Sequence, residues 1–120
     1  MNTDKISGGL AGKILRVDLS SRKISTEDTE KYAKRFIGGR AINSLLLLNE
    51  VDPKTKWSDP ENMLIFGVGC LVGTLAPGAC RVSVDTINAF NNGKGSANFG
   101  GHFGAELKYA GFDHVVITGK

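Results

Sequence analysis

The chain has 120 residues, of which 41% are hydrophobic and 22% are charged, and its formal net charge is +3. This apolar content excludes a chain that is disordered throughout, and the length limits residues 1–120 to a single domain with a core of its own. The longest apolar runs, at 45–48 and 63–66, fall far short of the roughly 20 residues of a membrane span, so no membrane partner is expected.

The N-terminus and the charge pattern narrow the class of protein further. Residues 1–9 are polar and lack the apolar segment of a secretory signal, which predicts a cytoplasmic protein. The 15 Lys and Arg residues are scattered along the chain, which argues against a nucleic-acid partner, although the sequence pI is about 9.0. Cys70 and Cys80 form no C-x-x-C pair and are interpreted as half-buried thiols in a reducing compartment.

Hydrophobic periodicity predicts strands and short helices in the first half of the chain. Residues 15–19 alternate apolar and charged side chains, which indicates a half-buried strand, and 23–27 read as the returning strand of a hairpin. Asp28-Thr29-Glu30 is typical of a helix start, and we expect that helix to end near residue 37, before Gly38-Gly39. Residues 40–50 are apolar nearly all round, which predicts a buried second helix.

The second half of the chain is rich in loop signals. It is predicted, in chain order, as a loop over 51–60, a strand over 63–66, a Gly-rich loop over 67–78, an alternating strand over 81–87, a second Gly/Asn-rich loop over 88–101, a helix over 104–110 and a closing strand over 114–118. This mixture of elements indicates an α+β fold.

Glycine is the unusual component of the composition. It accounts for 16 of the 120 residues, whereas an average chain has roughly 7%. Gly67, Gly69 and Gly73 follow a predicted strand, a spacing that invites comparison with dinucleotide-binding loops. Such a site needs a helix to begin at the loop, and Pro77 would interrupt that helix. A tight bend is therefore favoured over a dinucleotide site.

Residues 98–104 lead directly into the third predicted helix, whose first-turn N–H groups favour an anion. Asn98 offers an amide, and Arg81 could donate a bidentate pair of hydrogen bonds to a phosphate. These residues suit a phosphate-bearing cofactor. On residue types alone, the alternative of a solvated Arg81 and an Asn98 that forms a turn stays open. His102 is interpreted as a structural residue, because no metal-ligand spacing or nucleophile–base pair surrounds it.

Several short blocks of sequence occur in a characteristic order. They are Ile14-Leu15-Arg16-Val17-Asp18-Leu19, Phe36-Ile37-Gly38-Gly39-Arg40, Asp59-Pro60-Glu61-Asn62, Gly73-Thr74 with Ala76-Pro77-Gly78, Arg81, Asn98-x-Gly100-Gly101-x-Phe103-Gly104-Ala105-Glu106-Leu107-Lys108, and Ala110-Gly111-x-Asp113. Over residues 12–120 this order resembles the N-terminal domain of the tungsten-containing aldehyde:ferredoxin oxidoreductases.

The resemblance implies a β-rich cofactor platform with short helices, incomplete relative to the full family domain. Such a platform holds a tungsten bis-pyranopterin cofactor or its molybdenum analogue. By resemblance, Arg81, Asn98, Phe99 and Gly100 are the cofactor-binding positions, and Asn98 also helps to hold the magnesium that bridges the cofactor phosphates.

The resemblance also implies an activity that needs more than this chain. Full members oxidise aldehydes to carboxylic acids and pass electrons through a [4Fe–4S] cluster to a ferredoxin-type carrier, and a related branch reduces aromatic acyl-thioesters. The cluster ligands of the family lie beyond the equivalent of residue 120, so the cluster would come from the remainder of the enzyme or from a partner subunit. Residues 88–93 depart from the family pattern, which leaves the substrate open. The alternative is a non-catalytic scaffold or assembly module, a possible homo-oligomer, that keeps the fold without the chemistry.

Overall fold

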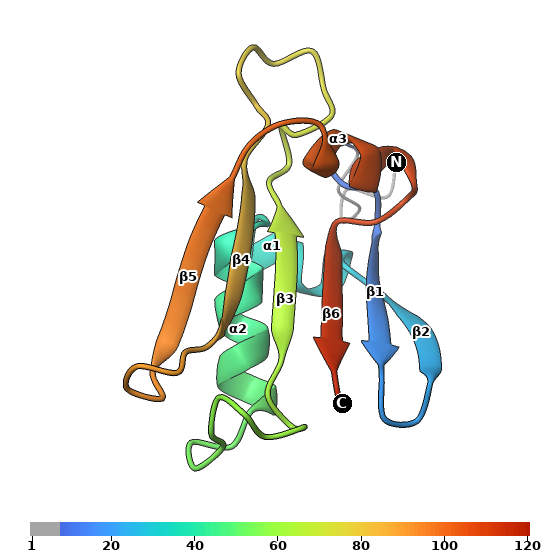
Figure 1. Ribbon diagram of the computed structural model, residues 1–120. Helices are drawn as coiled ribbons and strands as arrows, with labels where there is room; N and C mark the ends of the chain where they lie inside the picture. Colours follow the sequence, from blue (N-terminus) through green and yellow to red (C-terminus); the bar gives the residue numbers. More distant parts are fainter. Residues whose placement is uncertain (1–7) are drawn as a thin grey trace.

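The structure, a computed structural model, describes residues 8–120 (Figure 1). Residues 1–7, which make up most of the segment inspected for a secretory signal, lie outside the described residues. The elements in chain order are β1 (Lys13–Asp18), β2 (Lys23–Asp28), α1 (Glu30–Phe36), α2 (Arg40–Glu50), β3 (Leu64–Val68), β4 (Val82–Ile87), β5 (Lys94–Phe99), α3 (Phe103–Tyr109) and β6 (His114–Thr118). None of the helices in this part of the chain is long and apolar enough to cross a membrane.

The strands form one mixed sheet in the order β2-β1-β6-β3-β4-β5. β6 pairs in parallel with β1 and antiparallel with β3, while the other neighbours are antiparallel. The C-terminal strand is therefore a central strand, and it joins the N-terminal hairpin to the β3–β4–β5 meander (Figure 1). This arrangement confirms the predicted α+β class.

The prediction of one continuous loop over residues 88–101 was wrong, because residues 94–99 form β5. Residues 88–93 form a turn, in which the backbone N–H and the side-chain amide of Asn88 both donate to the carbonyl oxygen of Gly93. Residues 100–101 also lie outside the strand, as predicted. β5 pairs along its whole length with β4, from Ile87 opposite Lys94 to Val82 opposite Phe99. Its Gly, Ser and Asn residues have low strand propensity, so the strand exists because β4 offers it a pairing edge.

Helices α1 and α2 cover one face of the sheet, and α2 packs against β3 and β4 (Figure 1). The helix predicted over residues 40–50 is present, but only one of its faces is buried. Ile42, Asn43, Leu46 and Leu47 are buried, whereas Leu48 is 80% exposed, so α2 is amphipathic and not buried all round. The main core lies between these two layers and consists of Ile14, Ala33, Ile42, Leu46, Leu47, Val51, Met63, Ile65 and Val116.

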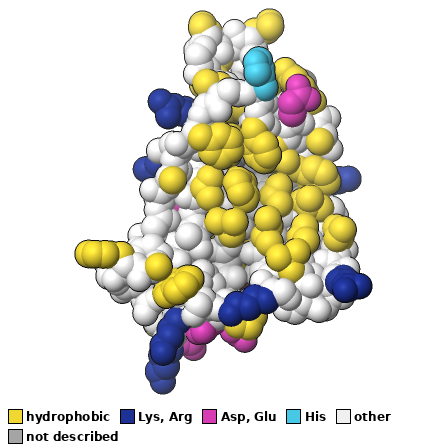
Figure 2. Space-filling view, in the orientation of Figure 1, with side chains coloured by type: hydrophobic (Ala, Val, Ile, Leu, Met, Phe, Trp, Pro, Cys, Tyr) yellow, Lys and Arg dark blue, Asp and Glu magenta, His cyan; other side chains and the backbone are white. Residues whose placement is uncertain are grey.

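The opposite face of the sheet is covered only at one end, by α3 (Figure 1). A second cluster forms there from Val68, Val72 and Val82, with Phe66, Phe99 and Leu107 packed against it. Gly104 allows α3 to approach closely, because a Cβ at this position would lie 2.9 Å from a methyl group of Val82. Figure 2 shows that hydrophobic side chains remain open over most of the rest of this face.

A buried ion pair fixes the end of α3 and the segment before β1. Lys108 Nζ lies 2.8 Å from Asp113 Oδ1, and the two side chains are 8% and 1% exposed. The Asp113 carboxylate also accepts the backbone N–H groups of Ala11 and Gly12. Burial opposes the charge of Asp113, but the hydrogen bonds from Lys108, Ala11 and Gly12 outweigh burial and lower its pKa below the ordinary value.

Candidate functional site

Arg81 and Asn98, two of the predicted cofactor-binding residues, border the same surface depression. Asn98 lies opposite Ser83 in the pairing of β4 with β5, and Arg81 immediately precedes β4. The depression has a volume of about 320 Å³ and lies where β3, β4 and β5 meet the start of α2. Its lining residues are Gly39, Arg40, Gly67, Gly69, Arg81, Ser83 and Asn98.

The other two predicted residues do not line this depression. Phe99 alternates to the opposite face of β5, where its ring packs edge-on against Phe103 with a centroid separation of 5.4 Å. Gly100 follows the end of the strand, and a Cβ there would lie 3.4 Å from Cys80 Sγ. Asn98 and Phe99, which were placed in a loop by the sequence analysis, are thus the last two residues of a strand.

The side chains around the depression form a donor set that fits an anion. Arg40 and Arg81 are exposed guanidinium groups, Asn98 contributes an amide, and no Asp or Glu lines the depression. Within residues 8–120, neither arginine forms an ion pair with a carboxylate. Guanidinium and amide N–H groups match the geometry of phosphate oxygens, so the residues present fit a phosphate-bearing cofactor.

Sequence reasoning missed Arg40 and Ser83 as members of this site. The sequence places Arg40 at the start of a helix and in one of the blocks that carry the resemblance, but neither observation predicts a binding role for it. Gly39 adopts φ +56°, and its N–H donates to the carbonyl oxygen of Val68 at 3.1 Å. This contact fixes the start of α2 beside the end of β3, and so Arg40 reaches the depression. A Gly-Gly-Arg step between two helices was the available signal.

A buried polar cluster lies beneath the depression and links α2 to β4 and β6. Asp85 Oδ2 accepts hydrogen bonds from Asn43 Nδ2 at 2.7 Å and from Ser83 Oγ at 2.8 Å. Asn43 Oδ1 lies 2.8 Å from His114 Nδ1. Asn43, Asp85 and His114 are fully buried, and Ser83 is 6% exposed. The predicted alternation along β4 is present, and its polar residues Ser83 and Asp85 lie on the face that α2 covers.

The hydrogen bonds of Asn43 determine the tautomer of His114. The amide nitrogen of Asn43 donates to Asp85, so the amide oxygen is the acceptor and His114 Nδ1 must carry the hydrogen. Among the described residues, His114 Nε2 has no hydrogen-bond partner. Burial lowers the pKa of His114 to about 4, which keeps the imidazole neutral near pH 7.

Asp85 is the charged member of the cluster. Burial opposes its ionisation, but hydrogen bonds from Asn43, Ser96, Ser83 and Lys94 outweigh burial and lower its pKa. Lys94 Nζ lies 3.0 Å from Asp85 Oδ1, and the lysine also donates to Ser44 Oγ at 2.6 Å. The carboxylate therefore holds α2, β4 and β5 together beside the depression.

Gly67 provides the space for this cluster. A Cβ at Gly67 would overlap Asn43 Oδ1 and would lie 2.6 Å from His114 Nδ1. Gly67 belongs to β3, and Pro77 lies in the turn region after it, so residues 67–78 do not start a helix. The first glycine of the Gly67–Gly69–Gly73 pattern thus serves close packing of a strand on a helix.

The start of α3 does not border the depression. The sequence predicts that its first turn meets the same anion as Arg81, but no residue of α3 is among the lining residues, so this prediction is wrong. α3 packs on the other face of the sheet, and the helix start beside Arg81 and Asn98 belongs to α2. His102, which precedes α3, is exposed.

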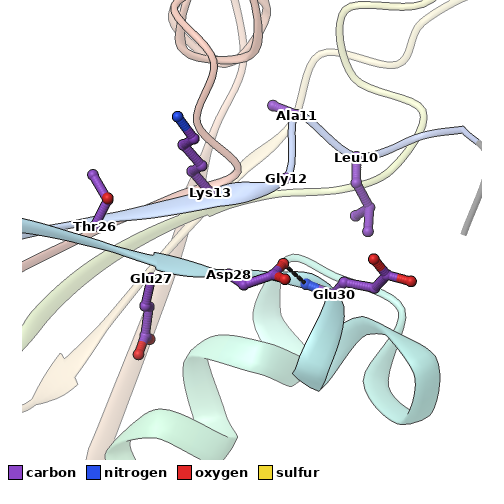
Figure 3. A pocket seen from close by; sticks show the side chains of 8 residues that line it. All are labelled: Leu10, Ala11, Gly12, Lys13, Thr26, Glu27, Asp28 and Glu30. Atoms are coloured by element: carbon purple, nitrogen blue, oxygen red, sulfur yellow. Dashed lines mark hydrogen bonds between the residues drawn. The ribbon is translucent and has the colours of Figure 1, made fainter. Parts of the chain in front are cut away.

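A second cavity, of about 500 Å³, lies near the opposite edge of the sheet, between the β1–β2 hairpin and the start of α1 (Figure 3). Its lining residues are Leu10, Ala11, Gly12, Lys13, Thr26, Glu27, Asp28 and Glu30. Asp28 Oδ1 accepts the backbone N–H of Glu30 at 2.8 Å, and Glu27 is ion-paired with Arg16 at 2.8 Å. These carboxylates thus have structural partners.

No metal-ligand cluster is present between residues 8 and 120, where no group of three or more His, Cys, Asp or Glu side chains could hold a metal ion. Cys70 and Cys80 are free and half-buried, as the sequence analysis expected. The anion-compatible depression around Arg81 and Asn98 is therefore the candidate functional site.

Comparison with known proteins places these features in a family context. Residues 14–120 match the family described as "Aldehyde ferredoxin oxidoreductase, N-terminal domain". The "Tungsten-containing aldehyde ferredoxin oxidoreductase" of Pyrococcus horikoshii is 46% identical over 113 residues, which are 93% of this chain and 19% of the relative. The "Aliphatic sulfonate oxidoreductase, WOR-like subunit" of Pyrococcus furiosus is 35% identical over 113 residues. This alignment covers 91% of this chain and 18% of the relative.

A solved structure has the same fold. It is described as "Active site complex BamBC of Benzoyl Coenzyme A reductase in complex with 1,5 Dienoyl-CoA". The superposition has a TM-score of 0.91 at 34% sequence identity, and covers 94% of this chain and 18% of the solved one. The chain thus spans about a fifth of the length of the relatives that it matches.

Proposed function

The chain belongs to the aldehyde ferredoxin oxidoreductase family, and from this membership we propose that residues 1–120 form one partial domain, the tungstopterin-binding N-terminal portion of an enzyme that oxidises aldehydes to carboxylic acids. The observation that carries the proposal is the joint placement of Arg81 and Asn98 at a depression lined by donors and free of carboxylates. The remainder of the enzyme, in the same polypeptide or in a partner subunit, would complete the active site.

In this proposal, Arg81 binds the cofactor phosphate through its guanidinium fork, and Asn98 binds beside it. Asn98 would also help to hold the magnesium of the cofactor. Phe99, at the end of β5, and Gly100, just after it, stay predicted cofactor-binding residues, although neither lines the depression. A tungsten pterin, when bound, supplies the two-electron redox chemistry of aldehyde oxidation. In this proposal the chain binds and orients the anionic end of that cofactor. The molybdenum analogue would be bound by the same residues.

The electron path is proposed to run outside this chain. A [4Fe–4S] cluster takes four cysteine thiolates, and residues 1–120 contain two cysteines. The cluster would therefore be supplied by the rest of the enzyme and would pass electrons to a ferredoxin-type carrier. A cytoplasmic location of the enzyme stays a prediction from the sequence.

The proposal is tested by measuring tungsten, molybdenum and iron per protein in the complete, natively purified protein that carries this chain. We expect tungsten or molybdenum near one per active site. Arg81→Ala and Asn98→Ala should each lower that content, because each removes a donor to the phosphate. Arg22→Ala is the matched control, since Arg22 is exposed in the turn between β1 and β2, far from the depression.

The outcomes separate the proposal from its alternative. If Arg81→Ala and Asn98→Ala retain the metal content of Arg22→Ala, the site assignment fails. A folded complete protein without tungsten, molybdenum or pterin would instead favour a scaffold or assembly module that keeps the fold without the chemistry.

A further inference from the structure

We infer that Arg40 is a further phosphate-binding residue of the depression and that Ser83, fixed by Asp85, holds its guanidinium in place. This inference rests on the proposed function, because the phosphate is that of the proposed cofactor. It assigns a binding role to Arg40 and a positioning role to Ser83, neither of which followed from the family resemblance.

The first step is the position of Arg40 opposite Arg81. Both side chains line one depression together with Asn98, although Arg40 comes from the first turn of α2 and Arg81 from the residue before β4. Two guanidinium groups around one depression balance the two charges of a phosphate dianion. Arg40 therefore adds a second cation and a second planar donor fork beside Arg81.

The second step is the hydrogen-bond order at Ser83. A hydroxyl group has one hydrogen, and the hydrogen of Ser83 is used in the 2.8 Å bond to Asp85 Oδ2. The oxygen is then available as an acceptor, and Arg40 Nε lies 3.4 Å from it. Because Nε faces Ser83, the two terminal nitrogens of the guanidinium stay available for a ligand.

The third step is that Asp85 cannot easily turn away from Ser83. It is fully buried, accepts from Asn43 at 2.7 Å and is ion-paired with Lys94 at 3.0 Å. Ser83 is itself nine-tenths buried. The orientation of an exposed arginine is thus set by a buried, charged network, which reduces the conformational freedom that the arginine loses on binding.

The test uses the complete protein prepared without tungsten and molybdenum, with inorganic pyrophosphate as the probe in isothermal titration calorimetry. Arg40→Gln should weaken pyrophosphate binding by about tenfold to a hundredfold, the usual value of a charge-assisted hydrogen-bond pair. Arg40→Lys keeps the charge and should fall in between, because lysine lacks the planar fork. Arg22→Gln is the control and should bind as the parent protein does.

The positioning role of Ser83 is tested by a double-variant comparison, because a purely structural role of Ser83 would give a different result. Ser83→Ala should weaken pyrophosphate binding several-fold, but the double variant Ser83→Ala/Arg40→Gln should bind no more weakly than Arg40→Gln alone. If Ser83 acted only on folding, its effect would add in full to that of Arg40→Gln, and this result would overturn the positioning role. Tungsten content after growth with tungstate should fall in the same order as pyrophosphate affinity: highest in the parent protein, lower in Arg40→Lys, and lowest in Arg40→Gln and the double variant.

The failure of this inference differs from the failure of the proposed function. If Arg81→Ala loses pyrophosphate and tungsten while Arg40→Gln and Arg40→Lys match Arg22→Gln, the role of Arg40 is wrong and the cofactor site stands. If Arg81→Ala and Asn98→Ala also match the control, the cofactor site itself is wrong.

Discussion

His114 shows how a single residue is constrained by its surroundings. The imidazole is fully buried on β6, donates through Nδ1 to Asn43 and has an unprotonated Nε2 without a partner among the described residues. A second proton would need an acceptor that this part of the chain does not provide. Burial therefore lowers its pKa from 6.5 to about 4, which ties the histidine to the stability of the protein rather than to proton transfer.

Stability should fall as the pH is lowered from about 6.5 toward 4. In this window the unfolded chain takes up a proton at His114 while the folded protein does not, so unfolding becomes more favourable. The pKa change from 6.5 to about 4 corresponds to a loss of about 3 kcal/mol at most. Urea denaturation at a series of pH values measures this loss as a change in the free energy of unfolding.

Two variants isolate the contribution of His114. His114→Gln retains an N–H donor for Asn43 and removes the titration, so its stability should change little between pH 6.5 and 4. His102→Gln, at an exposed histidine, should follow the parent protein. The loss expected from Asp85 and Asp113 begins only near and below their ordinary pKa values, because their folded pKa values are lowered. Parallel curves for His114→Gln and the parent would contradict this account of His114.

At the scale of the elements, the contact between β3 and α2 depends on the absence of a side chain at Gly67. We expect Gly67→Ala to destabilise the protein by about 3 kcal/mol, because its Cβ would overlap the buried Asn43 amide and press on His114. Gly69→Ala is the matched control, since a Cβ there meets nothing within 4 Å and its φ is not in the left-handed region. Because Gly69 lines the depression, both variants are compared in protein prepared without tungsten and molybdenum.

Native-state hydrogen exchange is suited to this comparison, because it reports the opening free energy of α2 and β3 amides in the complete protein. Faster exchange in α2 and β3 for Gly67→Ala, with Gly69→Ala close to the parent, is the expected pattern. Equal exchange in the two variants would mean that α2 tolerates a methyl group at this contact.

Local pattern was sufficient for most elements but not for β5. The alternation of Val82, Val84 and Thr86 predicted β4, and the Gly-Gly pair after residue 37 correctly separated α1 from α2. β5 has no such pattern, because its short polar and glycine residues lie at an edge where neither face is well buried. An edge strand of this kind is specified by pairing with β4, and pairing between distant segments cannot be seen in a local window.

Only part of the candidate site was predictable from the sequence. Arg81 and Asn98 were identified from residue type and family resemblance. The binding role of Arg40 and the buried cluster were not. Asn43, Asp85 and His114 are separated from one another by more than 25 residues along the chain, and Arg40 reaches the depression only because Gly39 fixes the start of α2 beside the end of β3. Only the register that places Gly67 opposite both Ser83 and His114 brings them together.

At the scale of the whole molecule, one face of the sheet is incomplete. Helices α1 and α2 cover the other face, whereas α3 covers only one end of this one (Figures 1 and 2). The open side chains include Leu15, Val17, Leu64, Phe66, Val84, Val115 and Ile117, with Phe103 at the edge of α3. An apolar face of this kind is typical of a surface that another part of an assembly covers.

We expect the remainder of the enzyme to cover this face, because the chain accounts for about a fifth of the length of its relatives. Residues 1–120 produced alone should then bind a hydrophobic dye and self-associate, and the complete protein should not. Leu64→Lys, at a position 38% exposed at the start of the inner strand β3, should reduce self-association of residues 1–120. In the complete protein the same change would bury an unpaired ammonium group, so folding yield and tungsten content should fall together.

Leu48→Lys distinguishes this effect from a general response to a new charge. Leu48 is 80% exposed on α2, on the side of the molecule away from the open face, so its replacement should leave both preparations unchanged. Size-exclusion chromatography with light scattering measures the association, and elemental analysis measures the tungsten. If Leu64→Lys and Leu48→Lys give the same folding yield and tungsten content in the complete protein, the open face is exposed to solvent in that protein. If this face instead joins copies of the complete protein, Leu64→Lys should lower the number of subunits per particle and leave the tungsten content unchanged.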